Sequence, residues 1–205
     1  MPTARWNAGP ERLKIGGIVM GSSAKSGEYS TKNIHLRHIQ LVTERPVEQF
    51  LLRLFLRDAD MRSLCIVCPF ISSMADCRFS LADLRRKIEQ ERICTYIITR
   101  QPEEEYQVEA MTVLLGSPWI EVRYNPFVHA KVYVAMSRRE ADSFGLFGSG
   151  NLTAASFQRN IEVAIMLYGD GLGRTLLHEL NYWANGQLRT LRESTLVQRI
   201  TAERK

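Results

Sequence analysis

The sequence predicts an α/β fold: a single domain with one mixed, mainly β sheet flanked by helices. Three observations predict this fold class. Strand-like and helical segments alternate through the first half of the chain, which is typical of an α/β sheet. Consecutive strand-like segments follow, which favours a mixed sheet. The chain has 205 residues, of which 45% are hydrophobic and 24% charged, enough for one substantial core.

We interpret residues 1–33 as a flexible or partly ordered N-terminal arm, because Gly, Ser and Lys are frequent and periodicity is weak. A short strand at residues 14–20 (KIGGIVM) is the one element expected in this arm. Residues 34–205 are expected to form the domain, since no linker or internal repeat interrupts them.

In the first half of the domain, apolar spacing alternates between strand and helix periods. Pro46 can open a helix, Ser80 can cap the next one with Asp83 three residues on, and Gly116 can end a third. The continuous apolar run at 63–71 suits a strand buried on both faces. The predicted elements are strands at 34–42, 63–71 and 93–99, and helices at 46–60, 80–92 and 103–116.

The second half contains four strand-like segments and ends with an amphipathic helix. A short helix is expected from Leu152. The predicted elements are strands at 119–124, 128–136, 144–150 and 160–168, and a helix at about 172–191.

The stretch FVHAKVYV places His129 and Lys131 two positions apart in an apolar run. On a strand their side chains would share one face, where they would repel each other when ionised and lose hydration if buried. Downstream, the Gly148–Asn151 loop (GSGN) offers backbone N–H groups, a hydroxyl and an amide, which suits a phosphate. Taken alone, this loop is better interpreted as an ordinary tight turn, which Gly-Ser-Gly-Asn would also make.

Together, H-A-K, then G-S-G-N, then N-x-E at Asn160 and Glu162 resemble the phospholipase D superfamily, and its nuclease-type members in particular. The resemblance is close over residues 119–170, and upstream it rests on the order of elements. Met136 stands where the family has an aspartate, five residues after Lys131, and the segment from that lysine to the glycine loop is longer, which predicts a longer hairpin turn.

The resemblance implies a covalent mechanism that explains the paired cations. His129 would attack phosphorus and form a phosphohistidine. Lys131 and Asn151 would hold the non-bridging oxygens and the charge that builds in the transition state. Glu162 would accept a hydrogen bond from the imidazole and orient it. The expected catalytic residues are His129, Lys131, Asn151 and Glu162, and the expected phosphate-binding residues are Lys131, Ser149, Gly150 and Asn151.

One H-x-K motif supplies a nucleophile but no separate acid for the leaving oxygen. His35, His38 and His178 lie outside such a motif and are interpreted as surface or structural residues. Single-motif family members dimerise, so the resemblance implies a homodimer with a composite site. No spacing of ligands suits a catalytic metal, and the mechanism requires no cofactor.

The net charge of +5 mildly favours a polyanionic partner, and we expect nucleic acid, either DNA or RNA. Cys65 and Cys68 form a lone C-x-x-C, interpreted as small core residues. Candidate phosphate contacts are Arg85, Arg86, Lys87, Arg138 and Arg139, with solvated faces as the alternative. Candidate base-stacking residues are Trp119, Tyr124 and Phe127, with core packing as the alternative.

The sequence contains no apolar run long enough for a membrane helix and no signal-like start, so a cytoplasmic protein with reduced thiols is expected. The expected function is a metal-independent phosphodiesterase, a nuclease whose cutting is non-specific or directed by a partner protein. Two alternatives stay open. One is a lipid or small phosphodiester hydrolase, and the other is a non-cleaving nucleic-acid-binding or assembly module.

Overall fold

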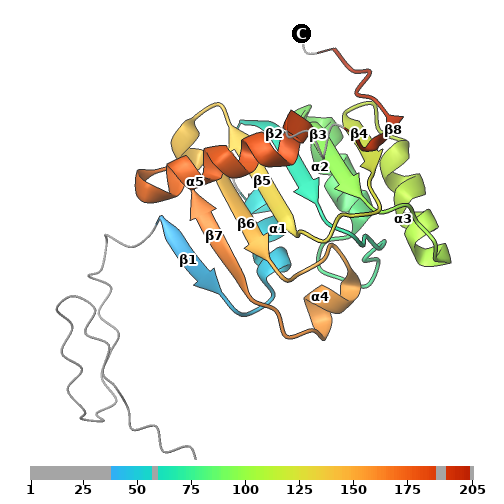
Figure 1. Cartoon of the computed structure of the whole chain (residues 1–205), viewed down its shortest axis with the longest axis horizontal. Coiled ribbons are helices and arrows are strands. Elements are labelled where there is room, and N and C mark those ends of the chain that lie inside the picture. Colours follow the sequence, from blue (N-terminus) through green and yellow to red (C-terminus); the bar gives the residue numbers. More distant parts are fainter. Residues whose placement is uncertain (1–37, 57–59, 188–192, 204–205) are drawn as a thin grey trace, which may run out of the picture. The chain divides into compact units, whose positions relative to one another are not determined.

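The computed structural model describes residues 38–56, 60–187 and 193–203, and these form a mixed eight-stranded sheet with helices on both faces (Figure 1). The strand order is β1-β7-β6-β5-β2-β3-β4-β8. The central β2, β3 and β4 run parallel, and all other neighbouring strands are antiparallel. The predicted mixed α/β sheet is therefore confirmed. The strands are β1 (Ile39–Val42), β2 (Met61–Val67), β3 (Cys94–Thr99), β4 (Ile120–Tyr124), β5 (Val132–Ser137), β6 (Phe144–Gly148), β7 (Ala164–Tyr168) and β8 (Thr195–Gln198).

Helices α1 (Pro46–Leu56), α2 (Leu81–Glu91) and α3 (Glu105–Leu115) bury their apolar residues in one core. Helix α5 (Gly171–Tyr182) and the π-helical turn Trp183–Gln187 that follows it cover the opposite face, with a second core beneath them (Figure 1). Alternation along the strands supplies both cores, because successive side chains point to opposite faces.

Several helix boundaries follow the sequence signals. Pro46 opens α1. The Ser80 hydroxyl accepts from the Asp83 N–H at 3.1 Å, and the Asp83 carboxylate accepts from the Ser80 N–H at 3.0 Å, so both orphan donors are satisfied. Gly116 caps α3. The predicted long turn after β5 contains a 3₁₀ helix, Glu140–Asp142.

The strands that carry the motifs begin later than predicted. β5 begins at Val132 instead of residue 128, and β7 at Ala164 instead of residue 160. His129, Lys131 and Glu162 therefore precede their strands. The physical reason is that the segment before β5 is held by other groups: the Asn125 side chain accepts from the Phe127 N–H at 2.9 Å, and Arg100 donates to the Val128 carbonyl at 2.9 Å.

The last helix is shorter than predicted, because α5 ends at Tyr182 and the turn after it is π-helical. Strand β8 was not predicted; it pairs antiparallel with β4. The arm at 1–33, its short strand at 14–20 and His35 lie outside the described residues, so these predictions and the boundary at residue 33 stay untested.

All four cysteines are free thiols, and Cys65 and Cys68 are buried, as core residues should be. Burial raises the pKa of Cys65 to about 12 and that of Cys68 to about 11. Within the described part of the chain, no helix is both long and apolar enough to cross a bilayer.

Candidate active site

The motif residues meet at the end of the sheet where the parallel strands finish and β5 begins. The loop after β6 lies beside the segment before β5, since the Gly148 N–H donates to the Lys131 carbonyl at 3.1 Å. The loop after β2 joins them from the other side through a parallel bridge between Ile71 and Leu152, and the Ser72 N–H donates to the Leu152 carbonyl at 3.0 Å. Three chain segments remote in sequence thus form one surface.

His129 is exposed and Lys131 is half-buried, so neither is on a core strand. The Lys131 ammonium donates to the carbonyl of His129 at 2.8 Å, which folds the lysine side chain back over the segment that carries the histidine. Water therefore reaches both side chains, and the desolvation that a buried strand would impose on them is avoided. The pair is accessible to an anion from solvent.

The glycine loop is held tightly against its neighbours. A Cβ on Gly148 would overlap the Val163 carbonyl and Ala164 on the adjacent strand. A Cβ on Gly150 would come within 2.8 Å of a methyl group of Val47 on α1. Beneath the loop, the buried Tyr133 hydroxyl donates to the Gly150 carbonyl at 2.9 Å. These contacts fix the loop's position independently of any ligand.

Glu162 is 7% exposed and collects hydrogen bonds from three side chains. It accepts from Ser149, from Ser156 at 3.0 Å and from Asn160 at 3.1 Å. Ser149 also accepts from the Val163 N–H at 3.0 Å. This buried carboxylate is therefore stabilised by donors, and it fixes the direction of the Ser149 hydroxyl.

The Oδ1 atom of Asn151 is buried and has no hydrogen-bond partner among the residues that the structure describes. Buried polar atoms without partners are rare, and they call for an explanation at each position. The backbone of Asn151 is fixed, because its N–H donates to the Ser156 hydroxyl at 3.0 Å. The Asn151 amide is thus held at the site, and its buried oxygen accepts no hydrogen bond from the described residues.

The sequence placed Glu162 beside His129, and no described hydrogen bond joins these two residues. Lys131, Ser149, Gly150 and Asn151 do gather with Glu162 around the same strand ends. His129 joins this group through its carbonyl, which accepts from the Lys131 ammonium. The orienting role of Glu162 stays a prediction.

The candidate cations on α2 contact carboxylates and carbonyls of the chain. Arg85 donates to the carbonyls of Val113 and Gly116 at 3.0 and 2.9 Å, which satisfies the end of α3. Arg86 and Lys87 pair with acids on α2 itself. Arg138 and Arg139 follow β5, whose six residues separate them by about 20 Å from the motif end. None of the five joins the site.

The other predicted side chains also divide clearly. Trp119 is 8% exposed and packs in the core, Tyr124 is half-buried, and Phe127 is 90% exposed. His38 pairs with Asp170 at 2.7 Å, and His178 hydrogen-bonds Glu140, whose pKa it lowers. Both contacts suit structural histidines, as interpreted from the sequence. Met136 is buried beneath α5.

Sequence reasoning missed three residues at the site: Phe70, Arg100 and Arg159. Phe70 and Arg159 line a groove of about 530 Å³ that also contains Asn151. Arg100 supports Phe70 and the segment before His129. The run TRQPEEE around Arg100 carries no motif, so only its contacts in the folded chain identify it.

Among the described residues, no group of three or more His, Cys, Asp or Glu side chains is placed to hold a metal ion.

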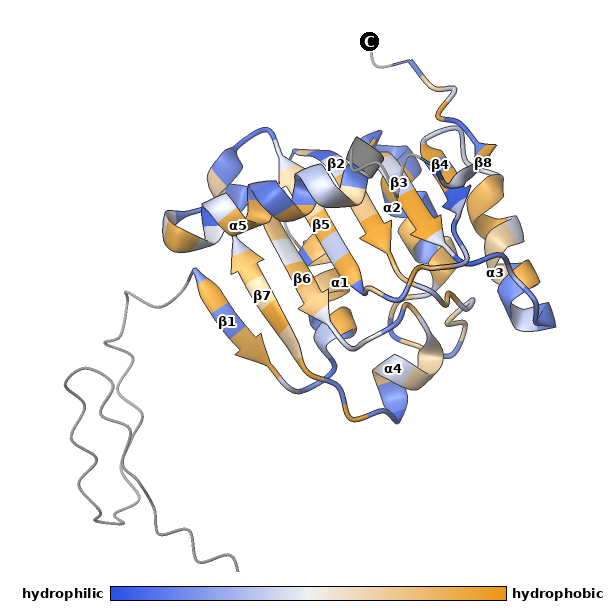
Figure 2. Ribbon diagram, viewed as in Figure 1, coloured by the Kyte–Doolittle hydropathy of each residue, from blue (hydrophilic) through white to orange (hydrophobic). Residues whose placement is uncertain are grey.

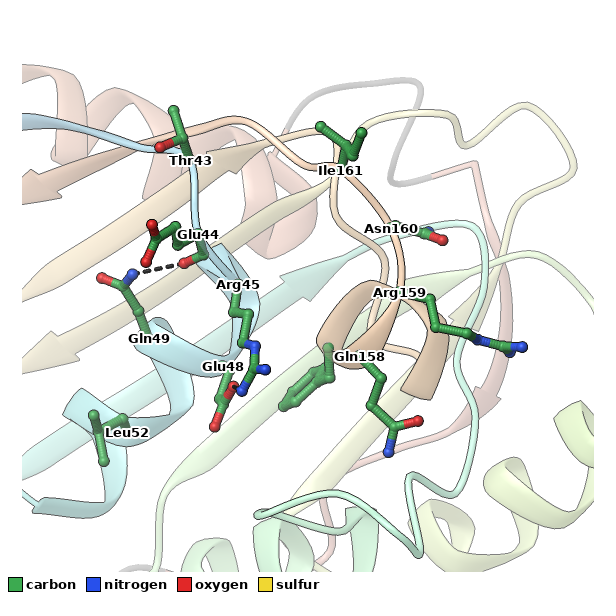
Figure 3. A pocket seen from close by; sticks show the side chains of 11 residues that line it. Thr43, Glu44, Arg45, Glu48, Gln49, Leu52, Gln158, Arg159, Asn160 and Ile161 are labelled. Atoms are coloured by element: carbon green, nitrogen blue, oxygen red, sulfur yellow. Dashed lines mark hydrogen bonds and ion pairs between the residues drawn. The ribbon is translucent and has the colours of Figure 1, made fainter.

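A second hollow, of about 600 Å³, lies on the other side of the α4 (Ala154–Gln158) loop. Figure 3 shows Arg159 and Asn160 directed away from α1, which carries Glu48, while Glu44 lies just before this helix. The Arg45 guanidinium pairs with Glu48 at 3.5 Å. Of the two hollows, the groove at Asn151 is the one that contains a residue of the glycine loop.

No known protein-family profile matches the chain, and no curated protein sequence matches it. Solved structures do. Nuc from Salmonella typhimurium, a phospholipase D family member, superposes with a TM-score of 0.55 at 15% identity, covering 78% of this chain and 98% of Nuc. NucT from Helicobacter pylori gives a TM-score of 0.54 at 15% identity, covering 78% of this chain and 98% of NucT. Polyphosphate kinase from Porphyromonas gingivalis gives 0.52 at 14% identity, covering 73% of this chain and 26% of the kinase.

The sheet, its helices and these superpositions define an α/β fold of the phospholipase D type. The chain has the phospholipase D superfamily fold. At these identities the likeness extends to the fold, and the chemistry has to be argued from the side chains.

Proposed function

We propose that the chain is a phosphodiesterase of the nuclease type, which cleaves DNA or RNA through a phosphohistidine. The observation that carries this proposal is the meeting of Lys131, the tightly held glycine loop and the Asn151 side-chain amide beside an exposed histidine. The non-bridging oxygens of a phosphodiester accept hydrogen bonds, so they would pair with the Lys131 ammonium and with the N–H groups of the Asn151 amide.

In the first step, a ring nitrogen of His129 attacks phosphorus and a P–N bond forms while the bond to the leaving oxygen breaks. Lys131 and Asn151 hold the non-bridging oxygens, and the Ser149 hydroxyl, directed by Glu162, lies beside them. A second imidazole gives its proton to the leaving oxygen. Water then attacks phosphorus with that imidazole as base, the P–N bond breaks and His129 is restored.

We assign the second imidazole to His129 of a second copy, since the other two histidines of the described ranges, His38 and His178, are engaged elsewhere. An exposed apolar strip supports a dimer. Ile39 and Leu41 pair across the sheet with Leu167 and Ile165, so they share the α5 face with them, and Leu41 is 65% exposed. The exposed Val163, directly before β7 and next to Glu162 in the chain, extends this apolar strip. Figure 2 shows apolar colour along β1 and β7 beside α5. A second copy would cover the strip.

The experiment that tests the composite site uses purified mixed dimers, with one wild-type chain and one His129→Ala chain. Such a dimer keeps a nucleophile or an acid but not both, so its turnover should fall far below half of the wild-type rate. A rate near half would mean that each chain has a complete active centre.

A separate experiment tests the dimer surface. Leu41→Glu should give a monomer by light scattering and lose cleavage, whereas Val108→Glu, a change at an exposed apolar position on α3, should alter neither. If the Leu41→Glu chain is still a dimer, the apolar strip is not the dimer surface.

One observation favours a second candidate, a non-cleaving phosphate-binding module. No described hydrogen bond orients the His129 imidazole, and Glu162 is directed to Ser149 instead. A denaturing quench at alkaline pH, where the P–N bond of a phosphohistidine is stable, with a phosphorus-labelled substrate separates the two functions. A labelled adduct that is lost in His129→Ala supports cleavage, and its absence during tight binding supports the module.

A further inference from the structure

An exposed aromatic ring is held in a fixed position beside the phosphate-binding residues. Phe70 is 38% exposed, although its backbone and ring are well supported. Its carbonyl accepts from the Cys68 thiol at 3.5 Å, and the Thr99 hydroxyl holds the preceding Pro69 carbonyl at 3.2 Å. These hydrogen bonds hold the backbone around Phe70 in place. The ring therefore stays exposed, because its segment cannot turn to bury it.

Arg100 connects this ring to the segment that carries the nucleophile. Its guanidinium carbon lies 5.5 Å from the centre of the Phe70 ring, within cation–π range. Its Nε donates to the carbonyl of Val128, directly before His129, at 2.9 Å. One side chain thus fixes the spacing between the ring and the histidine segment and brings a positive charge to both.

The ring faces the same groove as the Asn151 amide. Ile71 bridges to Leu152, so the residues before them, Phe70 and Asn151, are neighbours across this short parallel pair. Both line the groove of about 530 Å³, together with Tyr106, which is 47% exposed. The groove also has one carboxylate, Asp76, and one guanidinium, Arg159. It offers aromatic surface next to a phosphate site.

We infer that Phe70, positioned by Arg100, is a stacking platform for an unpaired base, so that the site takes a single-stranded segment of nucleic acid. This inference rests on the proposed function. In a duplex both faces of each base are covered by its neighbours, whereas in a single strand a base can leave the stack and lie on an aromatic ring. Arg100 adds positive charge where the flanking phosphate lies.

The test combines a protein change with a substrate change. Full-length chains carrying His129→Ala, which prevents turnover, are titrated with fluorescent oligonucleotide probes about 12 nucleotides long, within the range of site sizes of single-strand binders, in a DNA arm and an RNA arm that separate the two sources of the strand. Each probe is used intact and with one abasic position at a time. Phe70→Leu should weaken binding of the intact strand about tenfold. For the chain that keeps Phe70, an abasic probe at one position should weaken binding by the same factor as the Phe70→Leu change does. When the Phe70→Leu chain is combined with that abasic probe, the two losses in affinity should not add.

Three controls make the result specific. Phe70→Trp keeps a ring and should restore binding, which a purely structural role would not predict. Tyr182→Leu removes a comparably exposed ring from α5 and should leave binding unchanged. Blunt duplex binding should be the same with and without the Phe70→Leu change, at a temperature where a thermal melt shows both chains to be folded.

An unchanged affinity in Phe70→Leu, or additive losses with every abasic probe, would overturn the platform while leaving the nuclease proposal intact. An equal loss for duplex and single strand would also overturn it, because the ring would then act through the fold. A wild-type chain that neither binds nor cleaves any probe would overturn both proposals.

Discussion

Replacing Glu162 by Gln changes one charge and leaves the shape of the side chain unaltered. The carboxylate accepts from Ser149, Ser156 and Asn160. Gln can still accept from Ser156 and Asn160 through its oxygen. Its amide nitrogen then faces the Ser149 hydroxyl, which already accepts from the Val163 N–H. One charged hydrogen bond is lost and two become neutral.

Hydrogen bonds to charged groups contribute about 1.5–3 kcal/mol and neutral ones about 1 kcal/mol, so the lost bond and the two weakened bonds together should lower the free energy of unfolding by roughly 4 kcal/mol. For a chain of this size that corresponds to a fall in Tm of about 8–16 °C. The Ser149 hydroxyl would lose its fixed direction, so kcat should fall about tenfold or more, with KM changing less.

The assay is a thermal melt by circular dichroism together with cleavage of a labelled oligonucleotide at a temperature where both chains are folded. Glu109→Gln, an exposed change on α3, is the matched control and should alter neither quantity. Wild-type stability and wild-type kcat in Glu162→Gln would refute this account of the carboxylate. A stability loss with unchanged kcat would limit Glu162 to holding the fold.

Other expected outcomes concern the mechanism and the fold. His129→Ala should abolish turnover but keep oligonucleotide binding in anisotropy titrations, since Lys131 remains; loss of binding with an intact fold would argue otherwise. Chelator should leave cleavage intact, because two imidazoles supply nucleophile and acid, and a loss that magnesium restores would contradict the mechanism. Affinity should fall linearly with salt on logarithmic axes; a flat response would point to a neutral substrate. Tyr133→Phe should cost about 1–2 kcal/mol in denaturant titrations, because the Gly150 carbonyl loses its donor. Hydrogen bonds from Ser80 hold the pKa of Asp83 below its usual value, so this carboxylate stabilises the fold above the unfolded-state pKa and the gain disappears as pH falls through the folded-state pKa. The Tm difference between wild type and Asp83→Asn should therefore shrink from neutral pH to about pH 2, and a constant difference would exclude the charge as its cause.

Local signals predicted the framework of the fold. Pro46 and the Ser80–Asp83 pair act within one turn of helix, and the apolar run of β2 reflects burial on both sheet faces. Strand β8 gave no such signal, because it is a four-residue edge strand with no buried residue. Its pairing with β4 holds it in the sheet. The start of β5 was placed too early for a related reason. Val128 and Ala130 are apolar because they pack toward the second core, although their backbone does not pair in the sheet.

At the site, the family resemblance led us to expect the H-x-K segment beside the glycine loop, and the Gly148 N–H does donate to the Lys131 carbonyl. The sequence did not predict what Glu162 contacts, since Ser156 becomes a partner only when α4 folds back beside β7. Phe70 and Arg100 escaped notice for the same reason: their contact joins the ends of β2 and β3. Contacts between segments remote in the chain leave no period to read in the sequence.

The strand order also sets when the candidate site can assemble during folding. The parallel strands β2, β3 and β4 with their helices come from one continuous stretch, so their contacts are short in sequence. Lys131 lies beside Gly148 once β5 has paired with β6, and the loop after β2 can join them only when β5 also pairs with β2, which joins Val67 to Val132. β1 pairs Ile39 with Leu167, a contact between residues far apart in the sequence, so this edge of the sheet is expected to form later still. Folding intermediates that contain only the parallel half would lack the candidate site, so under the proposed function regained cleavage would report completion of the antiparallel half.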